Sequence, residues 1–222
     1  MDADETLALQ LARDVDLAFP ALVAEHSDRL YSIALRLLGD GRDAEEVAQD
    51  ALVRAFRAMH DYPRERVAAL RLRPWLASIT INLARNKRRR HDDRQPPSSL
   101  EPMLDAGFDP PTDARSAPPT AADRRETQRE LTEALLRLTP VVRTAIVLRH
   151  VDGLSVSEVA EALGRPEGTV KAQVHRGLRE LRVILEGAPG STGIAARSAH
   201  SAHSAESARS AASLRPALEA AR

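Results

Sequence analysis

The side chains best suited to chemistry in this sequence are basic and amide groups that recur at helical spacing. Between Thr169 and Arg179, an apolar stripe of Val170, Val174 and Leu178 would face inward. The outward positions are then Thr169, Ala172, His175, Arg176 and Arg179, with Lys171 and Gln173 on the flanks. Thr, Gln and Arg reach base edges, whereas Lys171 and Arg179 suit phosphates, so this stripe predicts a DNA-reading helix.

A second polar stripe lies in the first half of the chain, opposite the apolar residues Trp75, Leu76, Ile79 and Leu83. Its members are Ser78, Asn82, Arg85, Asn86 and Arg89. Two Asn residues one helical turn apart, beside arginines, can read bases. A solvated helix face with a basic end explains the same pattern equally well.

No residues are spaced for catalysis. The few acids and histidines lack the spacing of a nucleophile and its base, and no glycine-rich phosphate loop accompanies them. The chain has no cysteine, which excludes disulfides and thiolate metal sites. His200 and His203 would bind a metal only weakly. We therefore expect no enzyme activity, no cofactor and no metal site.

Charge and hydropathy further restrict the kind of protein that this chain can be. The 32 Lys and Arg balance the 32 Asp and Glu, but basic residues gather at Arg85–Arg94 and Lys171–Arg182, which leaves room for a basic DNA face. No apolar run approaches the roughly 20 residues that a membrane helix needs. The acidic start, Met1–Glu5, does not resemble a signal peptide, so we expect a cytoplasmic protein without membrane insertion.

Helical periodicity organises the first part of the chain. Apolar spacing predicts a helix over Leu17–Leu38, ended by Gly39. A second helix is expected over Ala44–Met59, with Asp43 as its cap and Glu46 completing a capping box. The segment His60–Arg73 reads as a loop with room for a short helix, and Pro74 begins a helix that runs to Arg90.

The second part contains a helix-turn-helix pattern. Leu131, Leu135 and Leu138 line one helix, and Thr139-Pro140 opens the next, which Gly153 ends. Ser155 then caps a short helix, with Glu158 completing a capping box. Gly164 begins a turn, and Gly168 or Thr169 begins a basic helix that would enter the major groove. The alternative is a basic surface helix in an ordinary bundle.

Scarce aromatic residues, at 3%, favour helix-on-helix packing. The expected fold is all-α, with two small helical domains joined by a flexible linker. We expect an N-terminal arm over 1–15, domains over 16–91 and 123–186, a proline-rich acidic linker over 92–122, and a low-complexity Ala/Ser tail over 187–222. Leu214 and Leu218 suggest a short docking helix in that tail, although a passive solvated tail is the simpler interpretation.

The segment "LTPVVRTAIVLRHVDGLSVSEVAEALGRPEGTVKAQVHRGLRELRVIL" (138–185) closely resembles region 4 of extracytoplasmic-function sigma factors. In that family the domain reads the promoter −35 element. The resemblance places these residues on the DNA-facing helix: Glu167, Gly168, Thr169, Lys171, Gln173, His175 and Arg176. The chain departs from the family at Ala172-Gln173, usually Ser-Arg, and at Gly177-Leu178, often Ala-Arg.

The segment "RPWLASITINLARNKRRR" (73–90) resembles the region 2 helix that recognises the −10 element, with Asn82 and Asn86 at base-contacting positions. The preceding loop resembles the one that captures a flipped base, for which Tyr62, Arg73 and Trp75 are the candidates. The segment "DAEEVAQDALVRAFRAM" (43–59) looks like the helix that docks on the polymerase clamp. Its exposed face would be Glu45, Gln49, Asp50 and Arg54.

Together these resemblances imply a sigma factor that binds the clamp and flap of core RNA polymerase and directs initiation at promoter DNA. Such factors are commonly held inactive by an anti-sigma factor, which is therefore an expected partner. Two other interpretations remain: a helix-turn-helix regulator that acts without polymerase, and a helical adaptor that binds only proteins. If core polymerase starts transcription at a promoter with this protein, the first alternative is excluded. Alanine substitutions at Arg89 and Arg176 test the second, because they should weaken promoter binding but leave the activity of a helical adaptor intact.

Overall fold

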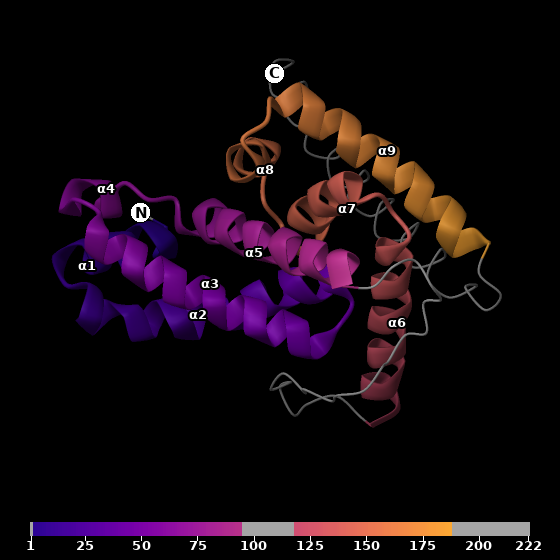
Figure 1. Cartoon of the computed structure of the whole chain (residues 1–222), viewed down its shortest axis with the longest axis horizontal. Coiled ribbons are helices and arrows are strands. Elements are labelled where there is room, and N and C mark those ends of the chain that lie inside the picture. Colours follow the sequence, from indigo (N-terminus) through magenta and orange to yellow (C-terminus); the bar gives the residue numbers. More distant parts are fainter. Residues whose placement is uncertain (1, 95–117, 188–222) are drawn as a thin grey trace, which may run out of the picture. The chain divides into compact units, whose positions relative to one another are not determined.

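The computed structural model describes residues 2–94 and 118–187, and within these stretches every regular element is a helix (Figure 1). The elements are α1 (Ala3–Arg13), α2 (Val15–Leu38), α3 (Gly41–Asp61), α4 (Arg64–Ala68), α5 (Leu72–Arg94), α6 (Pro118–Leu136), α7 (Pro140–Ile146), the π-helix η1 (Val147–Val151), α8 (Val156–Leu163) and α9 (Glu167–Glu186). The all-α prediction is confirmed. Of the described residues, those up to Leu178 belong to one compact unit and those from Arg179 to Gly187 to another.

Helices α1 to α5, the first block, form a bundle in which α2, α3 and α5 pack along one another (Figure 1). Leu30, Ile33, Val47, Leu76 and Ile81 are at most 2% exposed and belong to its core. Alanines between them, including Ala51 and Ala55, are fully buried and let the helix backbones approach closely. The core is thus aliphatic, as the scarcity of aromatic residues predicts.

The N-terminal segment is a helix and not merely an arm. Asp2 and Glu5 form a capping box at the start of α1, and Leu7, Ala8 and Leu11 are buried. This helix packs against α4 and α2. The apolar residues at 7, 8 and 11 have helical spacing, so the pattern was present in the sequence.

The predicted helices of the first block exist, with shifted starts. Helix α2 ends at Leu38, and Gly39 follows with a φ of 82°, as expected. Helix α3 begins at Gly41, so the predicted cap was wrong. Asp40 is the cap, and its carboxylate accepts from the Asp43 amide at 2.7 Å. Helix α5 begins at Leu72, two residues before Pro74, because Leu72 is fully buried in the core.

Helices α6 to α9 form the second block. Helix α6 already begins at Pro118, inside the predicted linker; proline lacks only an amide that the first turn leaves unpaired. The predicted capping box of α8 is confirmed, since the Ser155 hydroxyl accepts from the Glu158 amide at 3.2 Å. Gly164 turns the chain with a φ of 60°, and α9 starts at Glu167, slightly before the predicted Gly168 or Thr169. The linker residues 95–117 and the tail from 188 lie outside the described residues.

Arg143 of α7 is 4% exposed and donates to three backbone carbonyl groups. Its Nη1 reaches Leu37 O at 2.8 Å, and its Nη2 reaches Leu136 O at 2.5 Å and Leu138 O at 3.0 Å. The last carbonyls of a helix have no partner within that helix. Arg143 therefore caps the ends of α2 and α6 together.

Removing the α8 cap tests the helix-turn-helix scaffold. Ser155→Ala is expected to lower the free energy of unfolding by about 1 kcal/mol, because the Glu158 amide loses its acceptor. Urea denaturation followed by circular dichroism measures the change. Ser157→Ala, at an exposed position of the same helix, is the control and should be nearly neutral. Equal effects of the two substitutions would contradict the role of the cap.

His26 of α2 is 2% exposed, and its Nε2 lies 3.6 Å from Asp4 Oδ1 of α1. Burial, aided by the charges of Arg29 and Arg73 and opposed by Glu25, lowers the pKa of His26 from 6.5 to about 4. Burial also raises the pKa of Asp4. Both directions disfavour an ion pair, so His26 is neutral at pH 7.

This buried neutral histidine predicts acid sensitivity. The unfolded chain binds a proton at His26 with an ordinary pKa, whereas the folded chain resists protonation until about pH 4. Its contribution to stability is therefore complete above pH 6.5 and is lost as the pH falls toward 4, by up to about 3 kcal/mol. Urea denaturation across this range should show a flatter pH profile for His26→Leu than for wild type. Exposed His175→Leu is the control, and a wild-type profile in His26→Leu would overturn the assignment.

Candidate nucleic-acid interface

The exposed face of α9 carries nearly all of the predicted −35 residues. Those that are exposed to solvent are Glu167, Gly168, Thr169, Lys171, His175, Arg176 and Arg179. Ala172, predicted to point outward, is exposed as well. Gln173 differs, because it is half-buried and its Oε1 accepts from Arg165 Nη1 at 3.3 Å. Lys171 Nζ lies 3.6 Å from Glu167 Oε2, one turn earlier. The outward face predicted from periodicity is therefore present.

The predicted inward stripe of α9 was partly wrong. Val170 is fully buried and Val174 is half-buried, but Leu178 is 41% exposed. Gly177 is the buried residue instead. A Cβ atom there would lie 2.4 Å from both Val142 Cγ1 and Ile146 Cδ1 of α7. These α7 side chains reach the α9 backbone and leave no room for the alanine that the family often has at this position.

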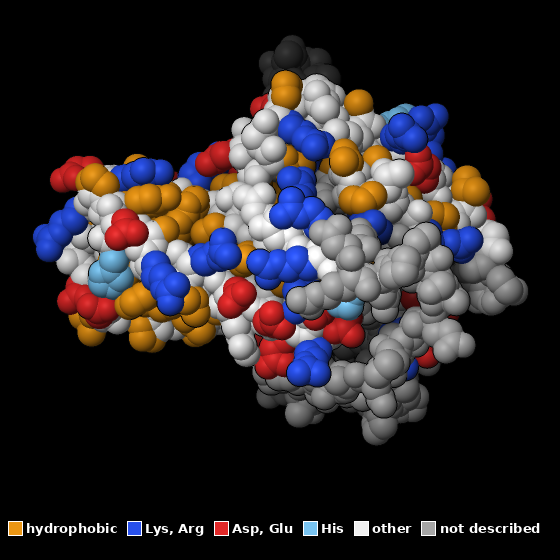
Figure 2. All heavy atoms as spheres, viewed as in Figure 1, with side chains coloured by type: hydrophobic (Ala, Val, Ile, Leu, Met, Phe, Trp, Pro, Cys, Tyr) orange, Lys and Arg blue, Asp and Glu red, His pale blue; other side chains and the backbone are white. Residues whose placement is uncertain are grey.

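The polar face of α5 is exposed along its C-terminal half. Asn82, Arg85, Asn86 and Arg89 are exposed, whereas Ser78 is half-buried and donates to Trp75 O at 2.7 Å. Figure 2 shows Lys and Arg side chains gathered over this part of α5. The buried face differs from the prediction: Leu76 and Leu83 are buried, but Trp75 and Ile79 are only half-buried. Ala77, Thr80, Ile81 and Ala84 are buried beside them.

Lys87 stands apart from the other basic residues of α5. Its Nζ lies 2.6 Å from Glu46 Oε2 and 3.1 Å from Asp43 Oδ1, both on α3. The hydrogen bond to Glu46 raises the pKa of Lys87 and lowers the pKa of Glu46. Lys87 thus joins α5 to α3, and the basic run of α5 is not uniformly available to DNA.

Two aromatic residues predicted for base capture lie near each other. The Tyr62 and Trp75 ring centroids are 6.3 Å apart with a 57° angle between the rings. The guanidinium carbon of Arg66, from α4, lies 3.6 Å from the Tyr62 ring centroid. Trp75 is half-buried at the start of α5, so one part of its ring surface remains accessible.

Arg73, the third residue predicted for base capture, is engaged elsewhere. Its Nη2 donates to Asp152 O of the second block at 2.6 Å. Arg71 pairs with Glu158 at 3.2 Å and Glu161 at 2.8 Å, and Arg29 pairs with Asp152. Arg29, Arg71 and Asp152 carry no sequence signal, because their partners in the other block lie 79 or more residues away along the chain.

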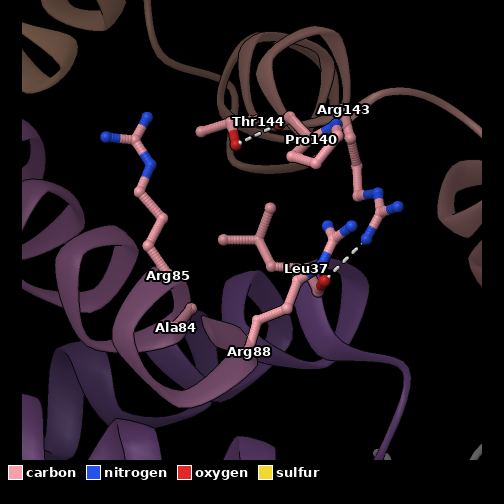
Figure 3. A pocket seen from close by; sticks show the side chains of 7 residues that line it. All are labelled: Leu37, Ala84, Arg85, Arg88, Pro140, Arg143 and Thr144. Atoms are coloured by element: carbon pink, nitrogen blue, oxygen red, sulfur yellow. Dashed lines mark hydrogen bonds between the residues drawn. The ribbon is translucent and has the colours of Figure 1, made fainter. Parts of the chain in front are cut away.

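Arg85 and Arg88 of α5 line a small cavity together with Leu37, Ala84, Pro140, Arg143 and Thr144 (Figure 3). Burial and the charge of Arg88 lower the pKa of Arg143 to about 10. Burial and the charge of Arg165 also lower the pKa of Arg85. The cavity measures about 30 Å³, which is room for a few water molecules and too small for a nucleotide.

The predicted polymerase-docking face of α3 is exposed. Glu45, Gln49, Asp50 and Arg54 are all accessible, and Gln49 Nε2 donates to Glu45 Oε1 at 3.3 Å. Val53, one turn beyond Gln49, is 46% exposed. The face therefore combines charged groups with an accessible apolar side chain.

Within the described ranges, His, Asp and Glu form no group of three or more that would suit a metal ion. His200 and His203 of the tail lie outside these ranges. No described helix is both long and apolar enough to cross a membrane.

Comparison with known proteins assigns the family. The models for Sigma-70 region 2 and Sigma-70 region 4 match residues 22–94 and 128–181. The ECF RNA polymerase sigma factor SigW of Bacillus subtilis is 31% identical over 171 residues, which cover 74% of this chain and 87% of that protein. SigE of Mycolicibacterium smegmatis is 33% identical over 161 residues, 72% of this chain and 59% of that protein.

Among solved structures, CnrH in complex with the cytosolic domain of CnrY aligns with a TM-score of 0.61 and 26% identity, covering 85% of this chain and 100% of that chain. Sigma factors are initiation factors and not enzymes. The matched regions, their order and the exposed polar faces of α5 and α9 agree: this chain belongs to the extracytoplasmic-function family of sigma-70 factors, which bind core RNA polymerase and direct it to promoters.

Proposed function

We propose that α9 reads the −35 element and that α5, with the turn before it, reads and opens the −10 element. The −35 residues are Glu167, Gly168, Thr169, Lys171, Gln173, His175, Arg176 and Arg179. The −10 residues are Tyr62, Arg73, Trp75, Ser78, Asn82, Arg85, Asn86 and Arg89.

The observation that carries the −10 assignment is the two-sided character of α5. Leu76 and Ile81 are at most 1% exposed, whereas Asn82 and Asn86 are exposed on another face. An amide side chain can donate and accept at once, which matches the N6 and N7 groups of adenine. A rigid buried face holds both amides at a fixed spacing, as base reading requires.

Tyr62 and Trp75 support capture of an unstacked base. Removing a base from the duplex costs a few kcal/mol, and stacking on an aromatic ring offsets about 1–3 kcal/mol per base. The two rings are not stacked face to face, because their planes are tilted by 57° with 6.3 Å between centroids. Arg66 over the Tyr62 ring limits the motion of that ring before DNA arrives.

For polymerase binding, the exposed face of α3 supports docking on the clamp through Glu45, Gln49, Asp50 and Arg54. Val53 would supply a buried apolar contact at the centre of such an interface. The second block would contact the flap, as the family resemblance implies. We also infer an anti-sigma partner, because the related CnrH forms a complex with the cytosolic domain of CnrY. The site of action would be the cytoplasm, at the nucleoid when the factor is active.

Substitution on α9 tests the −35 assignment. In transcription with core polymerase, on a promoter found by mapping transcript starts, Arg176→Ala should lower promoter affinity by roughly ten- to a hundredfold. The loss should disappear when the −35 sequence is randomised, because the lost contact is specific. Arg182→Ala, an exposed arginine of the same helix outside the assigned face, is the control. An equal loss on both templates would contradict base reading.

Substitutions in α5 and just before it distinguish opening of the −10 duplex from recognition of its bases. Tyr62→Ala with Trp75→Ala should slow open-complex formation on duplex DNA and regain activity on a template with a pre-opened −10 bubble. Asn82→Ala with Asn86→Ala should stay defective on both templates, since the missing contacts are to bases. Permanganate reactivity of unpaired thymines measures opening. If the pre-opened template restored activity to both double variants, base reading by the asparagines would be contradicted.

The same experiments address the rival interpretation of a regulator that acts without polymerase. Such a protein would bind promoter duplex but would not start transcription with core polymerase. The comparisons do not favour this alternative, because region 2 has no role in it.

A further inference from the structure

Asp152, at the end of η1, has a side chain that is fully buried against the first block. Both carboxylate oxygens face Arg29 of α2: Arg29 Nε pairs with Oδ1, and Arg29 Nη2 donates to Oδ2 at 2.6 Å. Burying a carboxylate is unfavourable unless a cation and hydrogen bonds compensate it. For Asp152 the compensating cation is Arg29, 123 positions away along the chain.

Around this pair lies a wider set of contacts between the blocks. Arg73 Nη2 donates to Asp152 O of the second block at 2.6 Å. Within the first block, Arg29 Nη2 also reaches Arg73 O at 3.2 Å. Arg71 extends to Glu158 and Glu161 of α8. We call these six residues the interblock network: Arg29, Arg71, Arg73, Asp152, Glu158 and Glu161.

The network occupies the approach to the −10 element. Arg73 is one of the assigned base-capture residues, and Arg71 and Arg73 precede Trp75 on the same turn. Carboxylate and phosphate oxygens bind arginine in the same way, through short charge-assisted hydrogen bonds. The carboxylates of Glu158 and Glu161 therefore hold Arg71 in place of DNA oxygens. The backbone carbonyl oxygen of Asp152 does the same for Arg73.

We propose that Asp152, Glu158 and Glu161 form an intramolecular docking surface for Arg29, Arg71 and Arg73, and that this surface competes with promoter DNA for Arg71 and Arg73. In the closed arrangement the second block masks the −10 capture site of the free factor. Capture of the −10 element then requires the network to separate. The inference rests on the proposed −10 role of Arg73.

Because the chain has no cysteine, dyes can be attached at introduced cysteines alone to measure separation of the two blocks. Arg57→Cys on α3 and Ala172→Cys on α9, both at exposed positions, accept a donor and an acceptor dye in the full chain. Energy transfer then reports the ratio of closed to open molecules. Arg29→Gln and Asp152→Asn should each lower that ratio by roughly ten- to a hundredfold. The double variant should open little further, because the two substitutions remove one contact.

Arg29→Gln also makes a discriminating test of competition. The probe is a single-stranded oligonucleotide with the non-template −10 sequence found by transcript mapping. Loss of a positive charge alone would weaken DNA binding. The proposal predicts the opposite, namely tighter binding in proportion to the opening. Glu133→Gln, an exposed acid of α6 outside the network, is the matched control and should change neither measurement.

Each outcome bears on a separate claim. Unchanged energy transfer in both single variants would overturn the network, and so would opening without tighter DNA binding. If opening and tighter binding occur but Arg73→Ala in the Arg29→Gln background leaves binding unchanged, the −10 role of Arg73 fails and competition for it fails too. Transcription by the holoenzyme tests the sigma function independently. Glu161→Gln, at a side chain 47% exposed, repeats the test should Arg29→Gln not fold.

Discussion

The packing of one face of α5 against α2 and α3 is the contact on which the first block depends. Leu72, Leu76 and Ile81 are at most 1% exposed, and each such burial contributes roughly 1.5–3 kcal/mol. Helical periodicity then fixes where Asn82 and Asn86 project, since they share the same rigid backbone. The core and the proposed DNA-facing surface are therefore two sides of one helix. A substitution that shifts α5 in the core would also displace Asn82 and Asn86.

Arginine performs two different tasks in this molecule. Arg143 is 4% exposed and satisfies its charge on carbonyl groups at the ends of α2 and α6. Arg29 satisfies its charge on the carboxylate of Asp152. Guanidinium groups keep their charge when buried, so each must find acceptors. Polar contacts of this kind let two blocks separate into water at a lower cost than apolar packing does, because water replaces the lost partners.

Periodicity and capping predicted most of the helices, because both depend on residues a few positions apart. Ser155 and Glu158 form the capping box that their spacing predicts, and Gly39 and Gly164 end helices as expected. One error has a local cause, because Asp40 competes with Asp43 as a cap. The other has a tertiary cause, because the α7 side chains Val142 and Ile146 decide that Gly177, not Leu178, faces inward. The exposed faces of α5 and α9 were predictable for the same reason. The interblock network was not, since its pairs join residues 79 to 123 positions apart, which no local pattern links.

A formal net charge of zero by itself argues against a nucleic-acid partner. The interblock network explains how a neutral chain can still have a basic DNA-binding surface. Charges in a protein act over about 10 Å at moderate salt, so the total matters less than the local arrangement. Asp152, Glu158 and Glu161 place negative charge beside arginines that precede the −10 helix. The neutral total then partly reflects arginines that are paired with acids of the same chain. Separating the blocks would expose a basic surface without any change in composition, and under the proposed competition this joins DNA affinity to conformation.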